Sequence, residues 1–253
     1  MASGQCKVAR VFVNQYGDWP IAAYIAAMAA PTASTFDIKP RPRSGVADAL
    51  SEQAHKAITE LIRTRRLKGG DAVVEQKLAD SLGISRTPLR EALQRLEGEG
   101  LVVKSAGRSY AVRQVDLSEY LQSLKTREVL EGEAASLAAG RIPAAQLRTA
   151  QAEIDALRKS TRYHTTAHWR SDDHVHNLFA DHCGNQVMAG LIKGLRVTTR
   201  LFEIASIADR VDPDSDEHSA ILGALGSGDP KAARRAAQTH IRSLMKHALA
   251  DLS

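Results

Sequence analysis

The sequence of 253 residues contains only two cysteines, Cys6 and Cys183, which lie far apart and form no Cys-x-x-Cys pair. Neither a disulfide framework nor a zinc site built from thiolates is therefore indicated, and the reducing cytoplasm is the expected compartment. Aromatic residues make up only 4% of the chain. The core must consequently be built from leucine, isoleucine, valine and alanine, which favours helices over a β-sandwich.

The chain also lacks an apolar run long enough to cross a bilayer, which requires about 20 residues. The most apolar stretch, residues 19–30, is too short for a membrane span. A secretory signal peptide is an alternative for this run, but Asp18 and Pro20 at its edge fit that role poorly. We expect residues 1–45 to form a disordered N-terminal extension that ends in the linker-like segment KPRPRSG.

Positive charge is unevenly distributed along the chain. The formal net charge is +5, to which residues 1–45 and 46–115 each contribute +3 and residues 116–253 contribute −1. The excess positive charge lies wholly in the first half, which suits contact with a polyanion, whereas the second half needs another kind of partner. The length suggests one or two compact domains.

Residues 46–115 show the pattern of three helices closed by a hairpin. Apolar residues recur at helical spacing in the helices, and Gly83 ends the second of them. Ser85 has N-cap chemistry, and Pro88 stands in the first turn of the third helix, where its missing N–H costs nothing. The pattern predicts a winged helix-turn-helix. The predicted helices are residues 46–68, 75–82 and 86–98. The predicted strands are residues 101–104 and 110–113, and residues 72–74 form a short extended piece between the first two helices.

The third of these helices has side chains suited to reading DNA. In a helix-turn-helix, residues near the start of the recognition helix reach base edges in the major groove, and arginine, threonine, serine and glutamine are expected there. Arg86 and Arg90 are four residues apart and share a face, with Thr87 beside them. The alternative is a solvated face whose arginines pair with neighbouring acids. The short helix before and the hairpin after favour contact with DNA.

The segment ADSLGISRTPLREALQRLEGEGLV, at residues 79–102, resembles the helix-turn-helix signature of the GntR family of transcription regulators. The resemblance extends over about residues 46–116. It implies that Arg86, Thr87 and Arg90 contact the bases of an operator.

Other positions complete the DNA-binding set that the resemblance implies, and some depart from the family pattern. Gln76 stands where the family has a further base-contacting arginine, and because glutamine prefers adenine, the operator is expected to differ at that base. Ser85 and the wing residues Gly107 and Arg108 belong to the same set. Ser109 replaces a glycine that often follows in the wing, which weakens the expectation of a minor-groove contact.

No strand pattern occurs in the second half of the chain. Breakers divide it into six helical segments, which predict an all-α antiparallel bundle over residues 116–253. The fold class is therefore mainly α, with a winged helix-turn-helix before the bundle. The predicted bundle helices are residues 117–139, 144–159, 161–182, 186–208, 213–226 and 230–252.

Four side chains of this bundle could form a metal site. Asp172 and His176 are four residues apart on one face of the third bundle helix, while His218 and His240 lie in the fifth and sixth. If they converge, a carboxylate with three imidazoles is a plausible ligand set for zinc, nickel, manganese or a similar divalent ion. For any single residue of this kind, the alternative to metal ligation is a surface position or an ordinary hydrogen bond. We expect this alternative for three neighbouring residues, Asp173, His174 and His182.

The second half also resembles the FCD ligand-binding domain of the FadR subfamily, and six helices favour its VanR-like branch. The resemblance implies that the same four residues hold the metal and that an organic carboxylate takes its open positions. Arg127 and Arg200 are candidates to bind the remaining carboxylate oxygens. Arg127 could instead pair with adjacent glutamates, and Asn185, a third effector-binding candidate, could instead be only a helix cap.

Together these features predict a cytoplasmic homodimeric repressor that is not an enzyme. It would bind a palindromic double-stranded DNA operator and release it when a small carboxylate metabolite binds at the metal. A first alternative is a metal-dependent, hydrolase-like enzyme fused to a DNA-binding domain. A second alternative is a constitutive DNA binder whose bundle serves only to dimerise.

Overall fold

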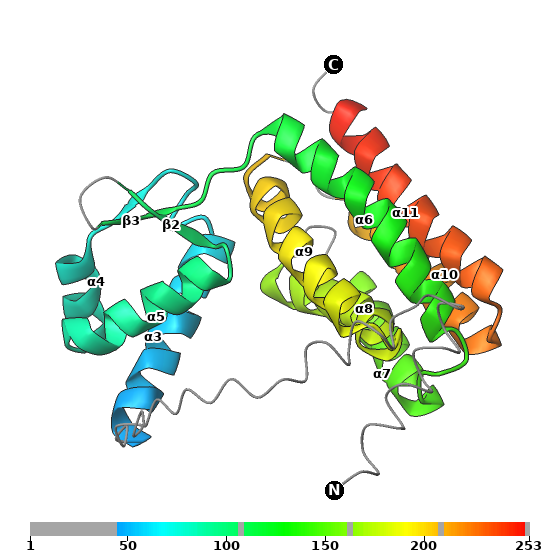
Figure 1. The fold of residues 1–253 in the computed structure, drawn as a ribbon, viewed down its shortest axis with the longest axis horizontal. Helices are drawn as coiled ribbons and strands as arrows, with labels where there is room; N and C mark the ends of the chain where they lie inside the picture. The colour runs from blue at the N-terminus through cyan, green and yellow to red at the C-terminus, as the bar shows by residue number, and fades with distance from the viewer. Residues whose placement is uncertain (1–44, 106–108, 161–163, 207–209, 251–253) are drawn as a thin grey trace, which may run out of the picture. The chain divides into compact units, whose positions relative to one another are not determined.

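The computed structural model describes residues 45–105, 109–160, 164–206 and 210–250. These residues form a winged helix-turn-helix followed by a helical bundle (Figure 1), so the mainly α fold class expected from the sequence is confirmed. The predicted N-terminal extension and the wing residues Gly107 and Arg108 lie outside the described residues. Within the four described ranges, no helix has the length and apolar character needed to cross a membrane.

The N-terminal part consists of three helices and a small sheet. Strand β3 lies in the middle of the sheet and pairs antiparallel with both β1 and β2. The predicted segments are present in the predicted order. They are α3 (Gly45–Arg63), β1 (Ala72–Val73), α4 (Glu75–Leu82), α5 (Arg86–Gly98), β2 (Val102–Lys104) and β3 (Tyr110–Val112).

The first helix is shorter than predicted, because α3 ends at Arg63 and not at residue 68. Arg65 adopts a left-handed backbone conformation with φ 57°, which a helix cannot continue. The backbone N–H groups of Arg66 and Leu67 both donate to the carbonyl of Leu61. A turn without glycine therefore ends the helix. The prediction used glycine as the stop signal, so it placed the helix end too far along the chain.

A compact apolar core fixes the orientation of the recognition helix α5. Leu89, Leu93 and Leu96 on α5 are fully buried against α3, where Ile58 is also fully buried. Their spacing places them on one face, so the opposite face of α5 is left for solvent or a ligand. Gly83 ends α4 with φ 65°, a conformation that favours glycine and permits the tight turn between α4 and α5.

The six bundle helices follow in the predicted order. Two begin at other residues than predicted. In α8, the backbone N–H of Thr165 donates to Nδ1 of His168, which fixes the start at Thr166 instead of residue 161. In α10, Pro213 occupies the first turn, so the helix begins two residues before it. The helices are α6 (Leu117–Ala138), α7 (Ala144–Arg158), α8 (Thr166–His182), α9 (Gln186–Ser206), α10 (Val211–Ser227) and α11 (Pro230–Ala250).

Helices α6 and α11 lie side by side in the bundle (Figure 1). They approach closely at Gly132, where an added Cβ would lie 2.8 Å from Cγ of Gln238. The main core of the bundle is formed by small and branched side chains around Phe179, Ile192 and Ile221. This core fixes α6, α8, α10 and α11 relative to one another, and these are the helices that supply the site described next.

Candidate functional site

Asp172, His176, His218 and His240 come together inside the bundle. One ligand atom from each lies within 4.8 Å of those from the other three. Asp172 and His176 are one turn apart on α8, while His218 comes from α10 and His240 from α11. All three histidines are buried, and His176 is 0% exposed. The four residues selected from their spacing therefore meet in one place.

The donor set of this cluster fits a divalent transition metal. The Nε2 atoms of all three imidazoles are buried and have no hydrogen-bond partner among the described residues. Oδ1 of Asp172 lies 3.5 Å from Nε2 of His176 and 3.3 Å from Nε2 of His218. A buried polar atom without a partner costs about 1–3 kcal/mol. Three such nitrogens beside one carboxylate are the donors that zinc, nickel or a similar ion prefers.

Two glutamates contact the outer nitrogens of the imidazoles. Nδ1 of His176 donates to Oε2 of Glu131 at 2.7 Å, and Nδ1 of His240 donates to Oε2 of Glu217 at 2.8 Å. Because a carboxylate can only accept, these bonds place the proton on Nδ1 and leave the lone pair on Nε2. Partners of this kind orient histidine ligands in metal sites. Sequence reasoning missed both roles, although Glu217 directly precedes His218.

Electrostatics keeps the cluster in the protonation state that metal ligation requires. Burial and the Arg196 guanidinium lower the pKa of His176 to about 3, and burial lowers the pKa of His240. Burial alone would raise the pKa of Asp172, but Arg196 and Arg200 outweigh it and hold that pKa well below its ordinary value. At neutral pH these two imidazoles are neutral and the carboxylate is ionised.

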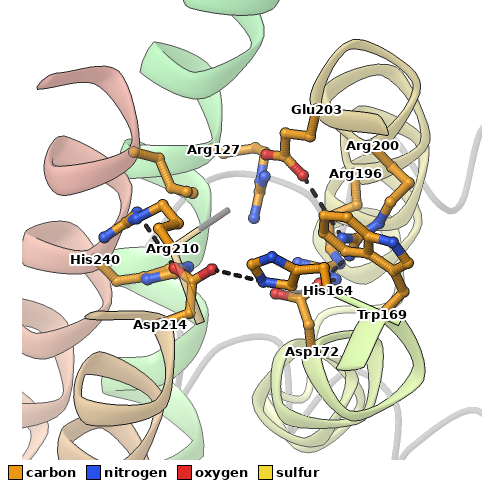
Figure 2. A pocket seen from close by; sticks show the side chains of 11 residues that line it. Arg127, His164, Trp169, Asp172, Arg196, Arg200, Glu203, Arg210, Asp214 and His240 are labelled. Carbon is orange, nitrogen blue, oxygen red and sulfur yellow. Dashed lines mark hydrogen bonds and ion pairs between the residues drawn. The ribbon is translucent and has the colours of Figure 1, made fainter. Parts of the chain in front are cut away.

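A pocket opens beside the cluster (Figure 2). Asp172 and His240 line the pocket as well as the cluster, so a small molecule in it would lie within reach of the proposed ligands. The pocket contains both arginines selected from the sequence and two that sequence reasoning missed. The four are Arg127, Arg196, Arg200 and Arg210.

Arg127 forms a buried ion pair and not the surface pair considered as an alternative. Its side chain is 3% exposed, Nε donates to Oε1 of Glu131 at 2.7 Å, and one terminal nitrogen donates to Oγ1 of Thr199 at 2.8 Å. Figure 2 shows its guanidinium pointing into the pocket. Since Glu131 also binds His176, this chain of contacts joins the pocket to the cluster.

Arg196 and Arg200 share two acceptors on α8. Arg196 donates to Oδ2 of Asp172 at 2.6 Å and to Oδ1 of Asp173 at 2.7 Å, and Arg200 contacts the same two carboxylates. These contacts occupy Oδ2 of Asp172 and leave Oδ1 directed at the histidines. Arg196 and Arg200 are four residues apart on α9 and share a face, which is a signal that could have identified Arg196.

Aromatic side chains form one wall of the pocket. The Arg200 guanidinium carbon lies 4.1 Å from the ring centroid of Trp169, and the His164 ring stacks on Trp169 at 4.5 Å. Nε2 of His164 is 3.2 Å from Oδ2 of Asp214, as the dashed line in Figure 2 indicates. The indole thus holds Arg200 by a cation–π contact and keeps it at the pocket.

Arg210 is buried at the start of α10 with unused hydrogen-bonding capacity. One terminal nitrogen contacts both carboxylate oxygens of Glu217 at 3.0 Å. The other lies 3.3 Å from Oδ1 of Asp214 but forms no hydrogen bond with a described residue. A buried guanidinium with a free donor at a pocket is suited to an anion.

The remaining polar residues selected from the sequence lie apart from the cluster. Oδ1 of Asn185 accepts from the backbone N–H of Met188 at 3.0 Å, which is the capping role, and Asn185 does not line this pocket. His174 pairs with Glu153 at 2.8 Å, and His182 donates to a backbone carbonyl. These two histidines are partly buried and hydrogen-bonded outside the cluster, which is one of the two environments expected for them.

The candidate DNA-contacting residues of α5 lie together on its outer face. Arg86, Thr87 and Arg90 are exposed, and Nε of Arg90 donates to Oε2 of Glu75 at 2.7 Å. Ser85 is exposed and holds the N-cap position with extended backbone, but its side chain makes no capping hydrogen bond. The hydroxyl expected to cap the helix is therefore available for another partner.

Gln76 lies on α4, one residue after Glu75, and is exposed. Its Nε2 donates to Oδ1 of Asp80 one turn later, at 2.8 Å. This bond uses one of the two amide hydrogens, so the carboxamide keeps a donor and an acceptor for a base edge. The structure leaves the wing candidates Gly107 and Arg108 undescribed.

Two family profiles match the chain. The family described as "Bacterial regulatory proteins, gntR family" matches residues 50–112, and the FCD domain matches residues 122–243. The first match contains the helix-turn-helix, and the second contains the four residues of the metal-type cluster. Both profiles agree with the resemblances recognised in the sequence.

Two relatives that match most of the chain are named as transcriptional regulators. The HTH-type transcriptional regulator YcbG of Bacillus subtilis is 27% identical over 206 residues, which cover 76% of this chain and 87% of the relative. The "Probable D-xylose utilization operon transcriptional repressor" of Paenarthrobacter nicotinovorans is 27% identical, over 78% of this chain and 87% of its own. Both relatives are named as transcriptional regulators, which favours regulation over the metalloenzyme alternative.

Solved structures show the same fold at low sequence identity. McbR/YncC of Escherichia coli has a TM-score of 0.65 and 18% identity, and the match covers 81% of this chain and 99% of that one. A GntR-type regulator from Rhodococcus sp. RHA1 also has a TM-score of 0.65, with 19% identity over 80% of this chain and 98% of that one. The order of a winged helix-turn-helix and a helical domain is therefore shared.

Proposed function

Because the chain belongs to the GntR family of bacterial regulatory proteins and carries an FCD domain, it is a DNA-binding transcriptional regulator, and we propose that it is a metal-dependent repressor. A small organic acid, bound at a metal ion in the bundle, would control its affinity for the operator. Residues 46–115 would form the DNA-binding domain and residues 116–253 the effector-binding domain.

The observation that carries this proposal is a cluster of three buried Nε2 atoms that have no hydrogen-bond partner among the described residues and lie beside the carboxylate of Asp172. Two of them, on His176 and His218, face its Oδ1. Asp172, His176, His218 and His240 would hold the ion, while Glu131 and Glu217 would orient two of the imidazoles. A bound ion would supply a Lewis acid to which an anionic oxygen can coordinate. The protein would not use it for catalysis.

The pocket supports an organic acid as the effector. Arg127, Arg200 and Arg210 direct guanidinium groups at a space that also reaches the cluster. Planar guanidinium groups bind carboxylates through paired hydrogen bonds. Glu203, whose pKa is raised by burial, lines the same pocket and can bond a ligand hydroxyl. Hydroxy, keto and sugar acids therefore form the effector class that we propose.

DNA binding would require two copies of the chain. One helix-turn-helix covers a small part of a binding site, and a palindromic operator matches the two-fold symmetry of a homodimer. Repression would be relieved if the effector binds better to an arrangement of the dimer that does not fit the operator. Arg86, Thr87, Arg90 and Gln76 would read the bases, and Ser85, Gly107 and Arg108 would complete the contact with DNA.

We expect the protein, purified without a histidine tag, to contain about one divalent transition-metal ion per chain. Elemental analysis of the purified protein measures this directly. The double substitution His218→Ala with His240→Ala removes two of the four proposed ligands and is expected to abolish the bound metal. His174→Ala is the matched control, since it removes a partly buried histidine from α8 that pairs with Glu153 outside the cluster.

Absence of metal from the wild-type protein, even after reconstitution with zinc, nickel and manganese, would contradict the coordination proposal. An operator affinity that changes neither with metal nor with organic acids would then favour the alternative of a constitutive DNA binder. Metal loss in the double variant together with retention in His174→Ala would support the assignment and direct the search for the effector to hydroxy, keto and sugar acids.

The substitution Glu131→Gln is expected to weaken metal binding by about 10–100-fold. The amide keeps the size of the side chain but removes the charge that holds the proton on Nδ1 of His176. Competition with a chromogenic chelator of known affinity measures the change. Glu133→Gln, on the same helix but in an exposed pair with Arg234, serves as control and should bind metal like wild type. Equal affinities for all three proteins would refute the orienting role of Glu131.

A further inference from the structure

Glu75 and Arg90 form an ion pair between the two helices of the helix-turn-helix. Nε of Arg90 on α5 donates to Oε2 of Glu75 at 2.7 Å, and Glu75 is the first residue of α4. The side chain of Arg90 is 57% exposed, whereas that of Glu75 is 15% exposed. The carboxylate is therefore largely covered, while the guanidinium remains open to a further partner.

This bond restricts how Arg90 can donate to anything else. It uses the single N–H on Nε and leaves the four N–H groups of the two terminal nitrogens. An arginine that reads guanine donates two parallel hydrogen bonds, to O6 and N7. With Nε engaged, only the terminal nitrogens can make that pair, so the guanidinium must approach the base end-on. The contact with Glu75 thus fixes one orientation of the side chain before DNA is bound.

The same carboxylate changes the balance between phosphate and base contacts. An unpaired arginine at an exposed position gains from any nearby phosphate, and such contacts carry no sequence information. Next to Glu75, the charge of Arg90 is largely compensated, so the pair gains less from a phosphate than a free arginine would. Weakening the contact with phosphate, which is the wrong partner here, is one route to sequence specificity.

We propose that Glu75 is a positioning residue for DNA sequence recognition, which holds Arg90 end-on and thereby sets the discrimination at one base pair of each half-site. Glu75 acts through Arg90 and does not itself touch a base. The inference rests on the proposed reading of bases by Arg90, and its test separates the two.

The experiment selects duplexes from a random DNA library with full-length wild type, Arg90→Ala, Glu75→Gln and Glu75→Asp. The dissociation constants for the best wild-type duplex and its single-base variants are then measured at two salt concentrations. Arg90→Ala is expected to lose preference at one base pair. Both Glu75 variants are expected to lose about tenfold in discrimination at that same base pair, with equal or tighter binding of mismatched duplexes.

Two controls distinguish positioning from a structural role. Glu75→Asp keeps the negative charge at the start of α4 but shortens the side chain by one methylene, so it should lose discrimination and keep thermal stability. Glu52→Gln removes an ion pair to Arg95 that joins α3 to α5 in the same domain. It should keep every base preference of the wild type.

The outcomes separate the inference from the proposed function. The positioning role is overturned if Arg90→Ala changes the preference at one base pair and both Glu75 variants keep the wild-type preference there. Base reading by Arg90 would still stand in that case. Should Arg90→Ala leave every preference unchanged, base reading by Arg90 fails, and the role of Glu75 fails with it.

Discussion

Chelation of the bound metal is expected to lower the midpoint of thermal unfolding by on the order of 10 °C. An ion that binds only the folded state at about 1,000 times its dissociation constant stabilises that state by about 4 kcal/mol. In a protein of this size, each kcal/mol shifts the midpoint by about 2–4 °C. Without the ion, three buried Nε2 atoms lack a partner among the described residues. Differential scanning calorimetry with and without chelator measures the shift.

The double variant His218→Ala with His240→Ala provides the control for this prediction. It lacks two of the proposed ligands, so chelator should not change its unfolding midpoint. Return of the wild-type midpoint on adding back one equivalent of the ion would show that the loss is reversible. A wild-type midpoint that does not respond to chelator, in protein shown to contain the metal, would contradict a stabilising role of the ion in the bundle.

Much of the cluster was predictable because its residues follow helical periodicity. Asp172 and His176 share a face of α8 by their spacing of four residues, which the sequence displays directly. His218 and His240 required more, since only the antiparallel packing of α10 and α11 brings them to that face. The resemblance to the FCD domain supplied that step. In the structure, one ligand atom of each of the four residues lies within 4.8 Å of those of the other three.

The surroundings of the cluster could not be predicted, because they depend on how helices distant in sequence pack. Glu131 lies 45 residues before His176, and no spacing rule connects a glutamate on α6 with a histidine on α8. Arg210 pairs with Glu217 and Asp214, which in the sequence resembles an ordinary charged helix start. Burial turns such common charged residues into parts of a site, and burial is a tertiary property.

Helix ends show a similar division between local and tertiary signals. Gly83 ends α4 as predicted, because the left-handed conformation there favours glycine. The end of α3 at Arg63 was missed, because the left-handed residue that follows is Arg65, which carries no such signal. The sequence allows Asn185 to be either a helix cap or an effector contact. Its bond to the N–H of Met188 places it as the cap of α9.

Replacing Arg127 by methionine is expected to destabilise the metal-free protein by about 3–5 kcal/mol, because it leaves the charge of Glu131 buried with one fewer partner. Glu131 is 0% exposed. Burial alone would raise the pKa of Glu131, but Arg127 and His176 outweigh it and hold that pKa well below its ordinary value. Chemical denaturation in the presence of chelator measures the change without the contribution of the ion.

Two further variants test whether the uncompensated charge is the cause. Arg127→Met combined with Glu131→Gln removes both charges and should recover part of the lost stability, since a neutral pair is cheaper to bury than one unpaired ion. Arg234→Met breaks an exposed pair between α11 and α6 and should cost less than about 1 kcal/mol. If the double variant is as unstable as Arg127→Met alone, lost packing and the lost bond to Thr199, and not the charge of Glu131, explain the need for arginine at this position.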